Sequence, residues 1–570
     1  MAFRRWALTG FGMSLVLAIL LAAADPTAAY KELDRANVDA AGARARVAAL
    51  VQALSEFAMP RSATVLLAAL ASDPEQSEGV RAAARGELAA RAAEDPALAQ
   101  LLLTEQGENG KLPSALAVAI ARGHLERALQ IAPPDEDAAF ETVREGPALE
   151  AASSAATARP LDKELAAEMG LSAPEPALKP APEPHRGLPA RAQRELDLAR
   201  ALAASVPPGN AAEGEAREVA ALAALAAGDP ALATKEFLAV ASLAVPRGDA
   251  AAAERRDKAY LQLARLAYQR GDDALATTLY DRVGRGAPQW LDALFEASWA
   301  HFRRSEDEKA LGNLLTLHAP FFQERFFPES FILKALLLYE NCRYADARAA
   351  LADFQRRYQP LHDGLAQALA GIPTPQAAAE LLARGPVGVQ QAVPAAAREE
   401  VARIEQASDL RGALAAAAQL AQEIDSIDRR RDAFRASDLV ARVAPLARQA
   451  RARLLETAGR RLMTRLDHER ATLRELLGQS LRLSYEIAGR EKELATSGPD
   501  AALSAQPHRD PPQVGDDEEL WPFQGEYWRD ELGSYRYQLG RRCKRPRTPA
   551  PTASQPAASP PPAVAGTPAD

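Results

Sequence analysis

Hydrophobic residues recur every three or four positions over most of the chain, which is the period of an α-helix. Near the N-terminus, Leu50, Leu54 and Phe57 show this spacing. Prolines that follow an aspartate interrupt the pattern at residues 74 and 96, where one helix should end and another begin. The pattern predicts an all-α protein in which residues 30–149 form helical hairpins, one of them turning at residues 122–124.

The first 29 residues have a different pattern. Arg4 and Arg5 precede an apolar run over residues 8–24, and small residues follow it. This order is typical of a secretory signal peptide. We therefore expect a periplasmic or secreted protein that is cleaved near Asp25 or Tyr30, with an uncleaved signal anchor as the alternative. No later apolar run is long enough to span a membrane, so any further envelope association should be weak.

Three further segments are rich in proline or polar residues. They cover residues 150–190, 496–519 and 546–570. Such compositions favour extended or disordered chain over packed structure. We interpret the first two as linkers and the last as a disordered tail. They separate a helical region over 191–495 from a short aromatic segment over 520–545.

Aromatic residues concentrate in one part of this helical region. Seventeen of them lie between Phe237 and Tyr358. The same block contains a recurring pattern, centred on small residues at Ala276, Ala310 and Ala347. The clearest copy also includes Tyr260, Leu263, Ala264, Gly271, Tyr280 and Pro288. Ser305 and Cys342 take the place of the turn glycine in the later copies. A fair earlier copy contains Gly228 and Phe237, and a weaker one surrounds Gly123.

This pattern resembles the tetratricopeptide-repeat family over residues 191–372. The resemblance implies an α-solenoid whose first helices line a concave, peptide-binding groove. On that alignment, the partner-binding positions would be Arg265, Tyr268, Gln269, Trp299, Phe302, Arg303, Leu336, Tyr339 and Glu340. The alternative is a stack of helical hairpins without a groove, in which Tyr268 and Phe302 belong to the core between repeats.

Residues 373–495 are expected to form long helices. Two seven-residue registers of apolar positions run along their C-terminal part. One contains Leu466, Leu473, Ile487 and Leu494, and the other contains Leu462, Leu476 and Leu483. Ser480 interrupts the first register and Glu469 the second. The registers predict the apolar seam of a coiled coil or helical hairpin. The many arginines should form a solvated face, with a stripe that contacts anionic lipid as the alternative.

Six aromatic residues lie between Trp521 and Tyr537. Because a helical stack has an apolar end to cover, we expect this segment to fold back as a cap that buries Trp521, Phe523, Tyr527 and Trp528. A partner-binding element is the alternative. Folding back could also bring Cys543 to Cys342, and an oxidising compartment would permit a disulfide.

With the repeat over residues 331–358, the aromatic segment resembles the C-terminal part of exported envelope tetratricopeptide-repeat proteins of myxobacteria and their relatives. Some of these proteins serve gliding motility.

Composition limits the function classes for this chain of 570 residues. Its net charge of −8 provides no global attraction for nucleic acid. The seven histidines show no metal-ligand spacing, and the two cysteines cannot build a multi-cysteine metal site. We find no motif for catalysis and therefore expect no catalytic residue, cofactor or metal.

The sequence thus predicts a non-enzymatic scaffold that binds protein partners in the bacterial cell envelope. One alternative is a component of a gliding-motility or export machine. Another is a protein that binds or cleaves peptidoglycan.

Overall fold

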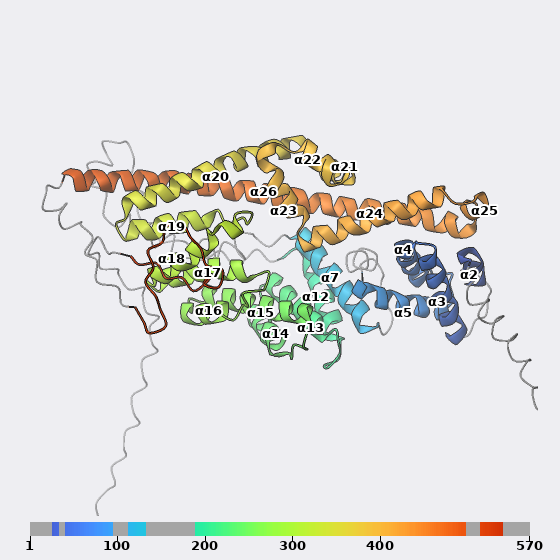
Figure 1. Cartoon of the computed structure of the whole chain (residues 1–570). Helices are drawn as coiled ribbons and strands as arrows, with labels where there is room; N and C mark the ends of the chain where they lie inside the picture. The colour runs from blue at the N-terminus through green and yellow to red at the C-terminus, as the bar shows by residue number, and fades with distance from the viewer. Residues whose placement is uncertain (1–24, 34–39, 95–111, 133–187, 497–513, 540–570) are drawn as a thin grey trace, which may run out of the picture.

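The computed structural model describes residues 25–33, 40–94, 112–132, 188–496 and 514–539 (Figure 1). Every regular element in these ranges is a helix, which confirms the all-α prediction. None of the described helices has the length and apolar character of a membrane-spanning segment. The predicted disordered tail and most of the predicted signal peptide and linkers lie outside the described residues.

The N-terminal part contains five described helices. They are α2 (Pro26–Leu33), α3 (Ala40–Glu56), α4 (Pro60–Ser72), α5 (Glu78–Glu94) and α7 (Ser114–Ile131). The turn predicted at residues 122–124 is wrong, because α7 runs through it and buries Gly123. Alanine and leucine on both sides favour the helix, and α7 packs closely along α12 (Ala190–Ala204), which outweighs the glycine's cost of about 1 kcal/mol.

The middle of the chain continues as consecutive packed helices. They are α13 (Glu213–Ala226), α14 (Pro230–Ser242), α15 (Ala250–Gln269), α16 (Asp273–Tyr280), α17 (Trp290–Arg303), α18 (Asp307–Leu317), η1 (Pro320–Phe322), α19 (Glu329–Glu340) and α20 (Tyr344–Gly371). Each of the α-helices in this series packs against the next one along the chain.

Four turns between these helices share one backbone geometry. Gly228, Gly271, Ser305 and Cys342 all have a positive φ, between 57° and 79°. In each turn the following residue donates its N–H to a carbonyl five positions earlier, as Glu306 does to His301 at 2.9 Å. This is the hydrogen bond of a Schellman motif, which ends a helix with one left-handed residue. Ser305 and Cys342 therefore occupy the glycine position of the turn, as the repeat pattern predicts.

The C-terminal part of the chain starts with short helices and finishes with the longest one. They are α21 (Pro375–Ala383), α22 (Gly385–Ala392), η2 (Ala395–Ala397), α23 (Arg398–Glu405), α24 (Ser408–Asp428), α25 (Asp432–Arg435) and α26 (Asp438–Thr496). The expectation of long helices throughout 373–495 holds for α24 and α26 only. With 59 residues, α26 is about 90 Å long.

One long helix, α26, contacts both ends of the molecule (Figure 1). Its first part packs on α2 and α4, and its later part packs on α19, α20 and α21. Accordingly, Leu439 and Val443 belong to the hydrophobic core of the N-terminal helices. Residues from Ala447 to Ile487 belong to the core that contains α15 to α20. The helix therefore contributes side chains to both cores.

Polar contacts fasten the N-terminal helices to the α24–α26 hairpin. The buried Glu423 of α24 accepts hydrogen bonds from the backbone N–H of Arg61 at 3.0 Å and of Ser62 at 2.7 Å. It thereby caps the N-terminus of α4, which has no capping side chain of its own. Arg442 of α26 forms an ion pair with Asp73 at the other end of α4.

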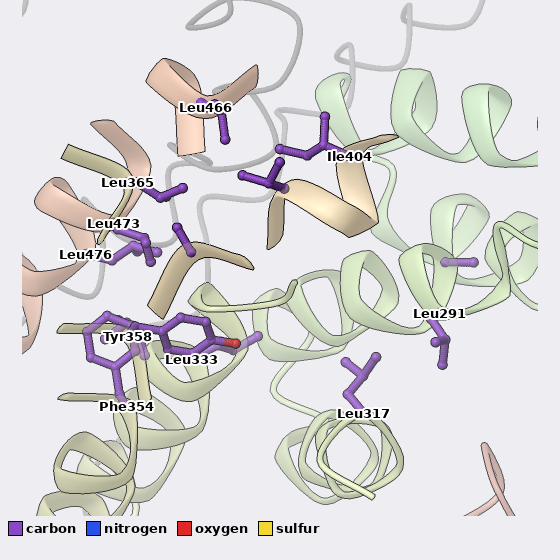
Figure 2. Packing of buried hydrophobic residues seen from close by; sticks show 14 of the residues in the cluster. Leu291, Leu317, Leu333, Phe354, Tyr358, Leu365, Ile404, Leu466, Leu473 and Leu476 are labelled. Atoms are coloured by element: carbon purple, nitrogen blue, oxygen red, sulfur yellow. The ribbon is translucent and has the colours of Figure 1, made fainter. Parts of the chain in front are cut away.

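The predicted apolar seam of α26 is buried except at Leu494, which is partly exposed. Figure 2 shows Leu473 and Leu476 near Phe354 and Tyr358 of α20. Both polar interruptions of the seam are buried as well, and each has a partner on a neighbouring helix. Ser480 Oγ accepts a hydrogen bond from Gln355 Nε2 of α20 at 2.9 Å. Glu469 forms an ion pair with Arg403 of α23.

The Glu469 carboxyl lies in an unusual electrostatic environment. The residue is 7% exposed, and Arg403 is shared with a second carboxylate, Glu400. Burial, followed by the nearby charge of Glu400, raises the pKa of Glu469 well above its ordinary value of 4.5. The folded protein therefore keeps a proton that the unfolded chain releases above about pH 4.5. The stability contributed by this proton is fully present below that pH and is lost as the pH rises toward the raised pKa.

We predict that Glu469→Gln flattens the fall of stability with rising pH, because glutamine mimics the protonated acid and cannot titrate. Urea unfolding from about pH 5 to about pH 9 should show the variant gaining on the parent by at most about 1.4 kcal/mol per pH unit. The control is Glu475→Gln, at an exposed position on the same helix. Parallel pH profiles for Glu469→Gln and the parent would contradict the prediction.

Candidate interaction site

Most of the nine predicted partner-binding residues lie inside the protein. Tyr268, Trp299 and Tyr339 are at most 3% exposed, and Phe302 and Leu336 are 7% exposed. These positions agree with the alternative in which Tyr268 and Phe302 form core between repeats.

Arg265 and Arg303 are engaged by neighbouring helices. Arg265 of α15 makes a two-pronged ion pair with Glu296 of α17, with its shortest contact at 2.6 Å. Glu296 also accepts a hydrogen bond from Tyr280 of α16 at 3.1 Å. Burial acts to lower the pKa of Arg265, but the charge of Glu296 raises it above its usual value. This cluster joins three helices.

Arg303 forms a similar link. Its Nε lies 3.0 Å from Asp273 Oδ2, and its guanidinium lies 4.3 Å from the centroid of the Tyr268 ring. Burial raises the pKa of Tyr268 to about 12. Gln269 is exposed and Glu340 is partly exposed. Partner binding by any of the nine residues stays a prediction.

The C-terminal segment folds back onto α18, the helix that presents Glu308, Gly312 and Thr316 on one face (Figure 1). Gly533 donates its N–H to Thr316 Oγ1 at 2.9 Å, and Tyr537 donates its N–H to the Glu308 carbonyl at 2.9 Å. The extended segment thus runs along α18 in the opposite direction, two residues for each helical turn.

Gly312 allows this close approach. A Cβ atom at this position would lie 1.7 Å from the carbonyl oxygen of Tyr535. No side chain fits there unless the segment moves. The requirement links two residues that are more than two hundred positions apart in the sequence.

The aromatic rings of the segment are less buried than predicted. Trp521 and Trp528 stack on each other with ring centroids 4.6 Å apart, and Phe523 packs against Tyr527 at 5.2 Å. Phe523 and Trp528 remain 44% exposed, so their predicted burial is wrong. The rings cover part of each other's apolar surface, while Leu532 and Leu539 are the residues of this segment that are buried against the helices. The segment therefore docks and still presents an aromatic surface.

Beside this surface lies a cleft of about 460 Å³. Leu532 and Arg529 of the C-terminal segment form one wall. The remaining lining comes from the start of α17 and from around η1, and includes Arg285, Trp290, Phe321, Phe322 and Arg325. These arginines could not be identified from the sequence, because nothing in their local sequence shows that they converge.

Cys342 is disulfide-bonded. The sequence contains one other cysteine, Cys543, which lies outside the described residues. In the part of the chain that the structure describes, no group of three or more histidine, cysteine or acidic residues could hold a metal ion.

No protein-family model matches the sequence, and no curated protein matches it.

We predict that Gly312→Ala detaches the C-terminal segment, because the new Cβ would overlap the Tyr535 carbonyl. The melting temperature should fall, and limited proteolysis should cut between residues 514 and 539 earlier than in the parent. Gly478→Ala is the matched control, since a Cβ there meets nothing within 4 Å and alanine favours a helix. Equal protection of the segment in Gly312→Ala and the parent would show that α18 does not hold it.

Proposed function

We propose that this protein is a non-enzymatic scaffold of the bacterial cell envelope that binds other proteins. The observation that carries the proposal is the aromatic surface of residues 521–528, in which Phe523 and Trp528 stay exposed while the following residues of the same segment, from Gly533 on, are held against α18. Exposed aromatic clusters mark interaction sites, and tryptophan and tyrosine are frequent anchors in interfaces. Holding the rings in place before binding lowers the entropic cost of association.

The remaining architecture supports a scaffold. The four turns of equal geometry agree with tetratricopeptide-like repeats stacked as an α-solenoid. Such a stack offers a long surface on which two of the predicted groove positions, the exposed Gln269 and the partly exposed Glu340, contribute to binding. A component of a gliding-motility or export machine is the same scaffold with a more specific partner.

One feature supports export. Cys342 is disulfide-bonded, and disulfides persist mainly in oxidising compartments. Helix α2 begins at Pro26 and buries Tyr30 and Leu33. Of the two expected cleavage sites, the one before Asp25 would leave this helix whole in a periplasmic or secreted protein.

Peptidoglycan binding is the second candidate, because exposed tryptophan rings can also stack on sugars. The Trp521–Trp528 pair is the observation that favours it. The variant Trp528→Ser distinguishes the two candidate functions when protein capture and glycan retention are measured separately.

We predict that Trp528→Ser reduces the capture of envelope proteins by the full chain. Chemical crosslinking in an envelope extract, followed by mass spectrometry, should show partners that the parent captures and the variant loses, while the melting temperature of the variant stays near that of the parent. Tyr485→Ser is the control, because Tyr485 is an aromatic residue on another element, α26, and is 76% exposed. Unchanged capture by Trp528→Ser would contradict the proposal. Retention on purified peptidoglycan that depends on Trp528, without protein capture, would favour the second candidate.

A further inference from the structure

The cleft beside the aromatic surface combines positive charge with an apolar floor. Three arginines, Arg285, Arg325 and Arg529, lie at its edge, and all three are exposed. Trp290, Phe321 and Phe322 supply aromatic walls, and Leu291 and Leu532 add aliphatic surface. A volume of about 460 Å³ accommodates one large side chain with its neighbouring backbone.

The three guanidinium groups interact with neutral groups of the protein. Arg285 donates a hydrogen bond to the Asp530 carbonyl at 2.8 Å, and Arg325 donates one to the Pro288 carbonyl at 3.3 Å. The Arg529 guanidinium lies 4.8 Å from the centroid of the Phe321 ring. Among the described residues, no carboxylate forms an ion pair with any of the three. Other arginines of the described chain do pair with carboxylates, as Arg265 and Arg303 do.

One carboxyl group faces this charge from α17. Asp292 is influenced electrostatically by Arg265 and by Arg325, and burial raises its pKa to about 6. This carboxyl is partly buried and is also near Arg265, and the neighbouring acidic residues Glu324, Asp530 and Glu531 form no ion pair with the three arginines among the described residues. The cleft therefore keeps a positive edge in a protein whose net charge is −8.

We propose that this cleft binds an acidic segment of a partner protein, with carboxylates on the arginines and a phenylalanine or leucine side chain against the aromatic walls. This inference rests on the proposed scaffold function and specifies the chemistry of its partner. Arginine forms strong, two-pronged hydrogen bonds to carboxylates, and arginine with aromatic residues is the combination that dominates binding energy at interfaces.

The composition of the chain's own tail disfavours it as the occupant. Residues 540–547 contain five basic side chains and no acidic one. Residues 548–570 contain one acidic side chain, Asp570. Such a segment would bring like charge to three arginines. A separate acidic chain provides the charge complementarity that the tail lacks.

The test uses the full chain and a fluorescein-labelled peptide in which glutamates flank one phenylalanine. Fluorescence anisotropy should show binding that weakens as salt is added, because the edge of the cleft is exposed. The double variant Arg325→Glu, Arg529→Glu should weaken this binding at least about tenfold. Arg356→Glu is the matched control, since Arg356 is 74% exposed on α20 and pairs only locally with Asp353. It should bind the peptide as the parent does.

Several results would overturn the inference. The first is equal binding of the acidic peptide by the double variant and the parent. The second is equally tight binding of a peptide with lysines in place of the glutamates. The third is arginine-dependent binding of the protein to vesicles of anionic phospholipid without any binding of the peptide. Peptide binding that appears only after deletion of residues 546–570 would assign the cleft to the chain's own tail and also overturn it. The crosslinking of the Trp528→Ser variant is scored independently. Loss of peptide binding with intact, Trp528-dependent capture therefore rejects the acidic-segment inference alone.

Discussion

The packing of α26 against both hydrophobic cores is the constraint on which the rest of the structure depends. The N-terminal helices have a core that includes Leu439 and Val443 of α26, and the repeat-like helices have a core that includes Leu473 and Ile487 of the same helix. Neither core is complete without it. A helix of this length contributes stability mainly through such burial, since isolated helices gain little from propensity alone. Glu423 of α24, which caps the N-terminus of α4, then holds the N-terminal helices against the α24–α26 hairpin.

Polar groups inside the seam determine how α26 sits against its neighbours. A slide of one turn would separate Ser480 from Gln355 and leave Glu469 without Arg403. Because a buried polar group without a hydrogen-bond partner is costly, these contacts select one alignment from several that apolar residues alone would allow. On α18, Gly312 and Glu308 select the path of the C-terminal segment in the same way. Segments that are distant in the sequence are thus positioned by a few polar or steric requirements.

Local signals predicted much of this fold. Hydrophobic period indicated helices, the repeat pattern located the turns at Gly271 and Ser305, and the seven-residue registers identified the buried face of α26. Local signals failed where tertiary packing decides. The glycine in α7 indicated a turn, but packing against α12 stabilises a continuous helix there. The rings of residues 521–528 indicated burial in the core, but they stack on each other. The arginine cleft was beyond prediction, because its lining comes from segments that converge only in the folded protein.

Native-state hydrogen exchange in increasing urea, below the unfolding transition, measures most directly whether α26 couples the two cores. If it does, the most protected amides of α4, α17 and α26 open together, with one free energy and one dependence on urea. The N-terminal half of α26, which contacts α4, and its C-terminal half, which contacts α20, should open with this same free energy and urea dependence. Opening of α2 to α5 at a distinctly lower free energy, while α17 and both halves of α26 keep their protection, would contradict the coupling.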